Sequence, residues 1–88
     1  MNFQKRVKLT QLRTKSLLCI GLDTDVNKIP HYLRNTRNPV LEFNKRVVDA
    51  TVDLVCAYKL NLAFYEVYGR QGWEALEKTR EYIEHPVL

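Results

Sequence analysis

Two short apolar runs constrain the fold more than any other feature of the sequence. The first, "SLLCIGL", covers residues 16–22, and the second, "CAYKLNL", covers residues 56–62 and contains one lysine. Runs that are apolar on both faces are typical of strands in parallel sheets that helices cover on each side. We therefore interpret both runs as buried strands, and the lysine as a charge that needs a partner or a function.

Helices are predicted before and between these strands. The first covers about residues 2–13, where Phe3, Val7 and Leu12 form a loose apolar stripe. The second covers about residues 39–55 and begins well, because Asn can cap a helix and Pro suits its first turn. Apolar residues recur along the second helix at intervals of three and four, namely Val40, Phe43, Val47, Thr51 and Leu54.

A third helix is predicted after the second strand, over residues 71–84. It follows a connecting segment, "AFYEVYG", that Gly69 and Gly72 punctuate. The residues after Pro86 predict the start of a third strand.

The order of these elements indicates consecutive βαβ units and a parallel sheet. The interval from Asp23, at the end of the first strand, to Lys59, near the end of the second, is about 36 residues and close to the ~31 residues per unit of an eight-unit barrel. A doubly wound open sheet fits this interval too.

Asp23 and Lys59 are the candidate functional pair. Residues two apart share a face of a strand, so Asp23 lies with Gly21 and Lys59 lies with Ala57, away from the bulkier side chains. In a barrel this face points inward, at the carboxyl ends of the strands, where active sites are built. Because a buried ion pair stabilises a fold little more than apolar residues of the same volume, a function explains the pair better than stability does.

Chemistry alone leaves the task of this pair open. A carboxylate that accepts hydrogen bonds and an ammonium that donates them would together hold a sugar or another polyol. Lys59 would instead be a Schiff-base nucleophile if burial lowered its pKa. No glycine-rich phosphate loop is present, because "GLDTD" contains a single glycine.

The net charge of +4 permits an anionic partner without requiring one. Five basic residues lie within the first fifteen positions, and we interpret them as the polar face of the first helix. No aromatic residues interleave with them, so nucleic-acid binding is not expected. The alternative function from another class is a non-catalytic basic α/β module that binds RNA or a protein partner. No apolar run approaches the ~20 residues of a membrane span, and no signal peptide is recognisable.

The cysteines and histidines do not form a metal-binding pattern. Cys19 and Cys56 lie in the two predicted strands, without a CxxC or Cys/His cluster. They are expected to be small buried residues in a reducing compartment, which favours the cytoplasm. His31 and His85 are expected to be solvated, while Trp73 is expected to pack between a helix and the sheet.

Three stretches resemble the N-terminal part of orotidine 5'-phosphate decarboxylase, in the branch of longer bacterial-type enzymes. They are "LLCIGLDTD" (17–25), "FNKRVVDATVDLVCAYKLNLAFYEVYG" (43–69) and "GWEALEKTREYI" (72–83), in the order and spacing of that family. The motif around Lys59 is the most specific. Thr24 and Leu60 depart from the pattern, because the family usually has proline at both positions, but neither departure removes a reactive group.

The resemblance implies a dimeric (β/α)8 barrel that converts orotidine 5'-monophosphate to uridine 5'-monophosphate and CO2, the last step of de novo pyrimidine synthesis, without cofactor or metal. It implies that Asp23 and Lys59 bind the ribose hydroxyls, with Asn61 and Asp25 assisting. Direct loss of CO2 leaves a carbanion at C6, which a lysine ammonium stabilises and protonates. No catalytic residue is expected in this chain, because the family carries that lysine in a D-x-K-x-x-D segment on the third strand.

The expected organisation is therefore a single incomplete barrel segment over residues 1–88, the N-terminal βαβα portion of a (β/α)8 barrel truncated at the start of the third strand. Its parts are the N-terminal helix (1–15), the first β/α unit (16–55), the second (56–85) and the start of the third strand (86–88). Such a length holds ~2.8 of eight units, so we expect the chain alone to be inactive and to expose unpaired strand edges.

Overall fold

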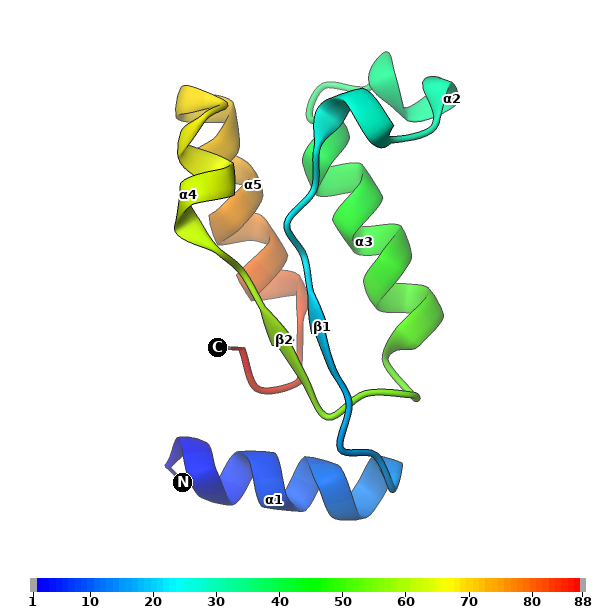
Figure 1. The fold of residues 1–88 in the computed structure, drawn as a ribbon, viewed down its shortest axis with the longest axis vertical. Coiled ribbons are helices and arrows are strands. Elements are labelled where there is room, and N and C mark those ends of the chain that lie inside the picture. The colour runs from blue at the N-terminus through cyan, green and yellow to red at the C-terminus, as the bar shows by residue number, and fades with distance from the viewer. Residues whose placement is uncertain (1, 88) are drawn as a thin grey trace.

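The computed structural model describes residues 2–87, in which helices pack against two short parallel strands (Figure 1). In chain order the elements are α1 (Phe3–Thr14), β1 (Cys19–Gly21), the 3-10 turn η1 (Val26–Lys28), α2 (His31–Arg34), α3 (Pro39–Thr51), β2 (Ala57–Lys59), α4 (Leu62–Glu66) and α5 (Gly69–Tyr82). Figure 1 shows the strands running between α3 and the α4–α5 pair, with α1 across one end.

The two strands pair in parallel, which confirms the predicted sheet type. Ile20 is the register partner of Tyr58, and Gly21 is the partner of Lys59. Val87 forms a further parallel bridge with Tyr58, whose backbone N–H donates to the carbonyl of Pro86 at 3.0 Å. The chain therefore returns to β2 where the third strand was predicted to start, and Leu88 lies outside the described residues.

The core lies on one face of the strands, between them and the helices. Its buried members are Leu22, Val40, Leu41, Val48, Val55, Tyr58, Leu60, Tyr65, Ala75, Leu76 and Ile83. On the opposite face, Cys19, Gly21 and Lys59 are exposed. This separation agrees with the predicted parity of the strands except at Ala57, which was placed with Lys59 but is 4% exposed. The exposure of Cys19 corrects the expectation that both cysteines are buried.

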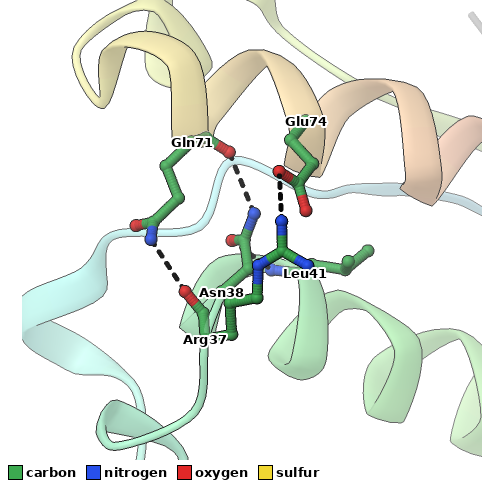
Figure 2. A network of polar contacts seen from close by, with 5 residues as sticks. All are labelled: Arg37, Asn38, Leu41, Gln71 and Glu74. Atoms are coloured by element: carbon green, nitrogen blue, oxygen red, sulfur yellow. Dashed lines mark hydrogen bonds and ion pairs between the residues drawn. The ribbon is translucent and has the colours of Figure 1, made fainter.

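The start of α3 is joined to the start of α5 by a small polar network (Figure 2). Asn38 caps α3 as predicted, since its side-chain oxygen accepts from the N–H of Leu41 at 3.3 Å, and its amide donates to the carbonyl of Gln71 at 3.0 Å. Gln71 in turn donates to the carbonyl of Arg37 at 2.7 Å, and Arg37 pairs with Glu74 at 3.6 Å. These contacts fix the two helices of successive units against each other at their N-terminal ends.

The buried face of α3 differs from the predicted stripe. The helix ends at Thr51 rather than near residue 55, and Leu54 is 61% exposed. Its buried face includes Leu41 and Asn44, which is 0% exposed, while Phe43 is only partly buried. The prediction was wrong here because a polar residue, Asn44, occupies the centre of the true buried face and broke the apolar pattern.

The segment predicted as a connection contains α4, and α5 begins at Gly69 rather than residue 71. Gly69 has a φ of +63°, a conformation that L side chains rarely adopt. Gly72 lies within α5, where a Cβ atom would be 1.8 Å from the carbonyl oxygen of Tyr65. The two glycines therefore do more than end elements, since they allow α5 to turn back and pack tightly against α4.

Three further expectations about burial are corrected. The expected stripe of α1 is not buried: Leu12 is 75% exposed, and Thr10 is the residue of the helix that is buried. Trp73 is 47% exposed, because Leu76 rather than Trp73 lies on the inner face of α5. His85 is not solvated but only 6% exposed, with Nε2 2.6 Å from the carbonyl oxygen of Val52.

Candidate functional site

Asp23 follows β1 directly and is tied to the end of β2. The preceding residue, Leu22, is buried and donates its N–H to the carbonyl of Lys59 at 2.8 Å. The Oδ1 atom of Asp23 accepts from the backbone N–H of Asn61 at 3.2 Å. Hydrogen bonds therefore continue beyond the paired strands, and they hold the Asp23 carboxylate at the carboxyl ends of both strands.

The side chains of Asp23 and Lys59 lie on the same face and converge over Gly21. A Cβ atom built on Gly21 would be 3.6 Å from Oδ2 of Asp23 and 4.0 Å from Cε of Lys59. Because Gly21 has no side chain, the space between the two functional groups stays open. The sequence prediction that these residues share a face at adjacent strand ends is therefore confirmed.

The environment of Lys59 differs from the expectation in its exposure, and it does not support a structural ion pair, the alternative that the sequence disfavoured. Its side chain is exposed among residues 2–87 rather than buried. Asp23 and Lys59 also do not form an ion pair, since within residues 2–87 only Arg37 and Glu74 approach within 4.0 Å. The two charges are accordingly free to meet a ligand instead of neutralising each other.

Asn61 and Asp25 both cap short helical turns. The side-chain oxygen of Asn61 accepts from the N–H of Ala63 at 3.2 Å at the start of α4. The Oδ1 atom of Asp25 accepts from the N–H of Asn27 at 2.9 Å at the start of η1. Each residue has a structural role beside any role in binding, and the Asn61 contact to Asp23 is made by its backbone.

A pocket of about 370 Å³ opens beside Asp23. Its lining residues are Gly21, Leu22, Asp23, Thr24, Asp25, Lys28, Ile29, Phe43, Val47 and Phe64. The volume is in the range of small-molecule sites, and a few charged groups among apolar walls are typical of them. Lys28 is a positive charge at this site that sequence reasoning missed, because the three-residue turn η1 that carries it is too short to show a period.

Behind Asp23 lies a buried polar network that sequence reasoning also missed. Asn44 is its centre: its Oδ1 accepts from the hydroxyl of Thr24 at 2.6 Å, and its amide donates to the hydroxyls of Tyr65 at 3.0 Å and Thr79 at 3.1 Å. The Tyr65 hydroxyl donates to the carbonyl of Leu22. An asparagine at a helical interval within the apolar positions of α3 was the available signal.

The pKa of Tyr65 is raised to about 12, mainly because the ring is buried. The negative charge of Asp23 adds to this effect, and the hydrogen bond from Asn44 opposes it. The Tyr65 hydroxyl therefore keeps its proton at neutral pH and remains a hydrogen-bond donor.

The described part of the chain contains neither a cluster of metal-binding side chains nor a helix that could cross a membrane. Within residues 2–87, His, Cys, Asp and Glu side chains do not gather in groups of three or more that would hold a metal ion. No helix among these residues has the length and apolar character to cross a membrane.

Comparison with known proteins gives one consistent family. No protein-family model matches the chain. The orotidine 5'-phosphate decarboxylase of Christiangramia forsetii is 53% identical over 79 residues, which are 88% of this chain and 29% of that protein. The enzyme of that name from Bacteroides fragilis strain YCH46 is 57% identical over 72 residues, 82% of this chain and 26% of that one. In Dehalococcoides mccartyi strain BAV1 it is 44% identical over 88 residues, 100% of this chain and 31% of that one.

Solved structures give the same result. A Toxoplasma gondii protein assigned to the orotidine-monophosphate decarboxylases superposes with a TM-score of 0.87 at 32% identity, covering 98% of this chain and 30% of that chain. The orotidine monophosphate decarboxylase of Leishmania donovani has a TM-score of 0.77 at 29% identity and covers 99% and 32%. These superpositions confirm the predicted fold class, the N-terminal βαβα portion of a (β/α)8 barrel.

The match is extensive for this chain and partial for its relatives. The chain spans between 26% and 31% of the length of these curated relatives. In sequence and in fold, the chain corresponds to the N-terminal portion of the orotidine 5'-phosphate decarboxylase family.

Proposed function

We propose that this chain provides the ribose-binding part of an orotidine 5'-monophosphate decarboxylase site. In this proposal Asp23 accepts hydrogen bonds from the ribose hydroxyls and Lys59 donates to them, with Asn61 and Asp25 assisting. The pyrimidine and the phosphate are bound by parts of the enzyme that these residues do not supply.

One observation carries the proposal: the Asp23 carboxylate and the Lys59 side chain converge over Gly21, where no side chain fills the space. An acceptor and a donor held side by side suit a pair of vicinal hydroxyls, each of which both donates and accepts. Their position at the carboxyl ends of adjacent parallel strands is the place where barrel enzymes bind substrates. The absence of an ion pair between them supports binding over a purely structural role.

We also propose that these 88 residues do not decarboxylate the substrate by themselves. Loss of CO2 leaves a carbanion that needs a positioned proton donor, and Lys59 is assigned to the ribose rather than to that role. Purified chain incubated with orotidine 5'-monophosphate should yield no uridine 5'-monophosphate above a blank. Formation of uridine 5'-monophosphate above the blank would contradict this proposal.

The complete enzyme is proposed to be a cytoplasmic homodimer. The family resemblance supports the dimer. Two free cysteines, one exposed and one buried, support a reducing compartment.

The binding assignment is tested by building this chain into a relative. Residues of the Christiangramia forsetii enzyme that match this chain are replaced by it, and kcat/KM is measured for orotidine 5'-monophosphate. Lys59→Ala and Asp23→Asn should each lower kcat/KM about tenfold to hundredfold, as expected for the loss of a charge-assisted hydrogen bond. Lys78→Ala and Asp53→Asn remove exposed charges elsewhere and should change little.

A deoxyribose substrate sharpens the test. If Lys59 and Asp23 contact ribose hydroxyls, their substitution should cost less with a 2'-deoxy or 3'-deoxy substrate, because one of the two partners is already missing. Equal losses with ribose and both deoxyribose substrates would show that the two residues act elsewhere.

A further inference from the structure

The segment that carries Asp23 and Asp25, residues 22–26, is held by groups from distant parts of the chain. Two tyrosine hydroxyls reach it from the second unit. Tyr65 donates to the carbonyl of Leu22, while Tyr68 donates to the carbonyl of Thr24 at 3.3 Å and accepts from the N–H of Val26 at 3.0 Å. These contacts engage the backbone on both sides of Asp23.

Asn44 connects this arrangement to α3. Its amide donates to the Tyr65 hydroxyl while its oxygen accepts from Thr24, so Asn44 and Tyr65 act on the same segment from two directions. Tyr65 and Asn44 are only 1% and 0% exposed, which protects their hydrogen bonds from competition with water. The segment is thereby fixed against helices of both β/α units.

On these contacts, and resting on the ribose-binding role proposed above, we propose that Tyr65, Tyr68 and Asn44 are positioning residues that aim the Asp23 carboxylate. The two tyrosines contact the backbone of residues 22–26, and Asn44 contacts the Thr24 side chain and the Tyr65 hydroxyl. In this proposal none of the three contacts the ligand. Their effect reaches Asp23 through the chain and through the N–H of Asn61, which donates to Asp23 Oδ1 at 3.2 Å. Loss of either tyrosine hydroxyl should let the carboxylate move away from Asn61.

The hydrogen bond from Asn61 provides a readout that needs no ligand. Because its N–H donates to Asp23, the amide proton shift of Asn61 at neutral pH should report that hydrogen bond in the 88-residue chain, and Asp23→Ala gives the shift without it. In Tyr68→Phe and Tyr65→Phe the Asn61 shift should move about halfway or more toward the Asp23→Ala value, and the Val26 amide of Tyr68→Phe should exchange about tenfold faster. A merely structural role would lower stability without moving the Asn61 shift, whereas Val26 exchange responds directly to loss of its Tyr68 acceptor.

Matched controls separate an effect on the position of the Asp23 carboxylate from a general loss of stability. Tyr32→Phe also removes a phenol hydroxyl, but from a residue that is 68% exposed, and it should leave the Asn61 shift unchanged. The Asn27 amide reports Asp25 through a local contact two residues away, so its shift should stay near the wild-type value in every variant. Tyr68 is only partly buried, which makes Tyr68→Phe the variant best able to keep the fold if Tyr65→Phe does not.

Two outcomes decide the proposal independently of substrate binding. An unchanged Asn61 amide shift in folded Tyr68→Phe would overturn it, even if Val26 exchange changes and even if Asp23 binds ribose. If both change while Asp23→Asn does not alter kcat/KM in the chimaeric enzyme, the aiming contacts are real and the ribose assignment is wrong.

Discussion

The two ends of β1 differ in how the rest of the chain contacts them. At the carboxyl end, residues 22–26 form hydrogen bonds with α3, with α4 and with Tyr68 just before α5. At the amino end, Leu17 and Leu18 are 82% and 65% exposed, and Leu12 of the neighbouring helix is 75% exposed. The candidate site is thus stabilised by contacts among the described residues, whereas these leucines at the start of the strand are exposed.

The largest effect on this comparison is expected from Gly72→Ala, which forces α4 and α5 apart behind the site. The new Cβ would meet the Tyr65 carbonyl oxygen at 1.8 Å, so the backbone must shift, and we expect a loss of about 3 kcal/mol in the free energy of unfolding. Denaturant unfolding measures it. Gly69→Ala is the matched control: it has open space but a positive φ, and should cost about 1 kcal/mol.

Asn44→Ala should remove the link between α3 and residues 22–26 at the cost of about 2–3 kcal/mol. The substitution leaves the hydroxyls of Thr24 and Thr79 without this partner in a buried setting. Asn35→Ala, at an exposed position, should cost far less. Equal losses for the two variants in urea unfolding would mean that the network does not hold the segment.

The pH dependence of stability tests the contribution of Tyr65, which contacts the carboxyl end of β1. Its pKa is about 12 in the folded chain and about 10 when unfolded, so the folded state favours the neutral phenol. The resulting stability is fully present below pH 10 and is lost as the pH rises toward 12, by about 2 kcal/mol. The free energy of unfolding is measured in steps of about one unit from about pH 9 to about pH 12, and it should fall more steeply for the wild type than for Tyr65→Phe. Parallel curves for the two proteins would contradict this cause.

The smallest effect is expected at the uncovered end. Leu12→Ala removes a large side chain that is already in solvent, so the free energy of unfolding should change by less than about 0.5 kcal/mol. Leu76→Ala in α5 removes the same atoms from a position that is 7% exposed and should cost about 2–4 kcal/mol. Similar losses at both positions would show that the start of β1 is covered in solution, for example by self-association.

Local sequence patterns predicted the order of the major helices and strands well and their edges poorly. The cap at Asn38 and the strand parity at Asp23 are short-range properties, and both were predicted correctly. The helix α4 was missed because its five residues are too few to show a period. The buried face of α3 was misplaced because Asn44 is polar, and its burial makes sense only with partners from β1, α4 and α5.

The sequence by itself determined that strands and helices alternate in parallel and that Asp23 and Lys59 share a face, because both follow from periodicity along the chain. Only the tertiary structure decided that Lys59 is exposed, that the two charges stay unpaired and that tyrosines from a later segment hold Asp23 in place. Those properties depend on contacts between residues some 40 positions apart. Such contacts leave no periodic signal in the sequence, because they form only when the core packs.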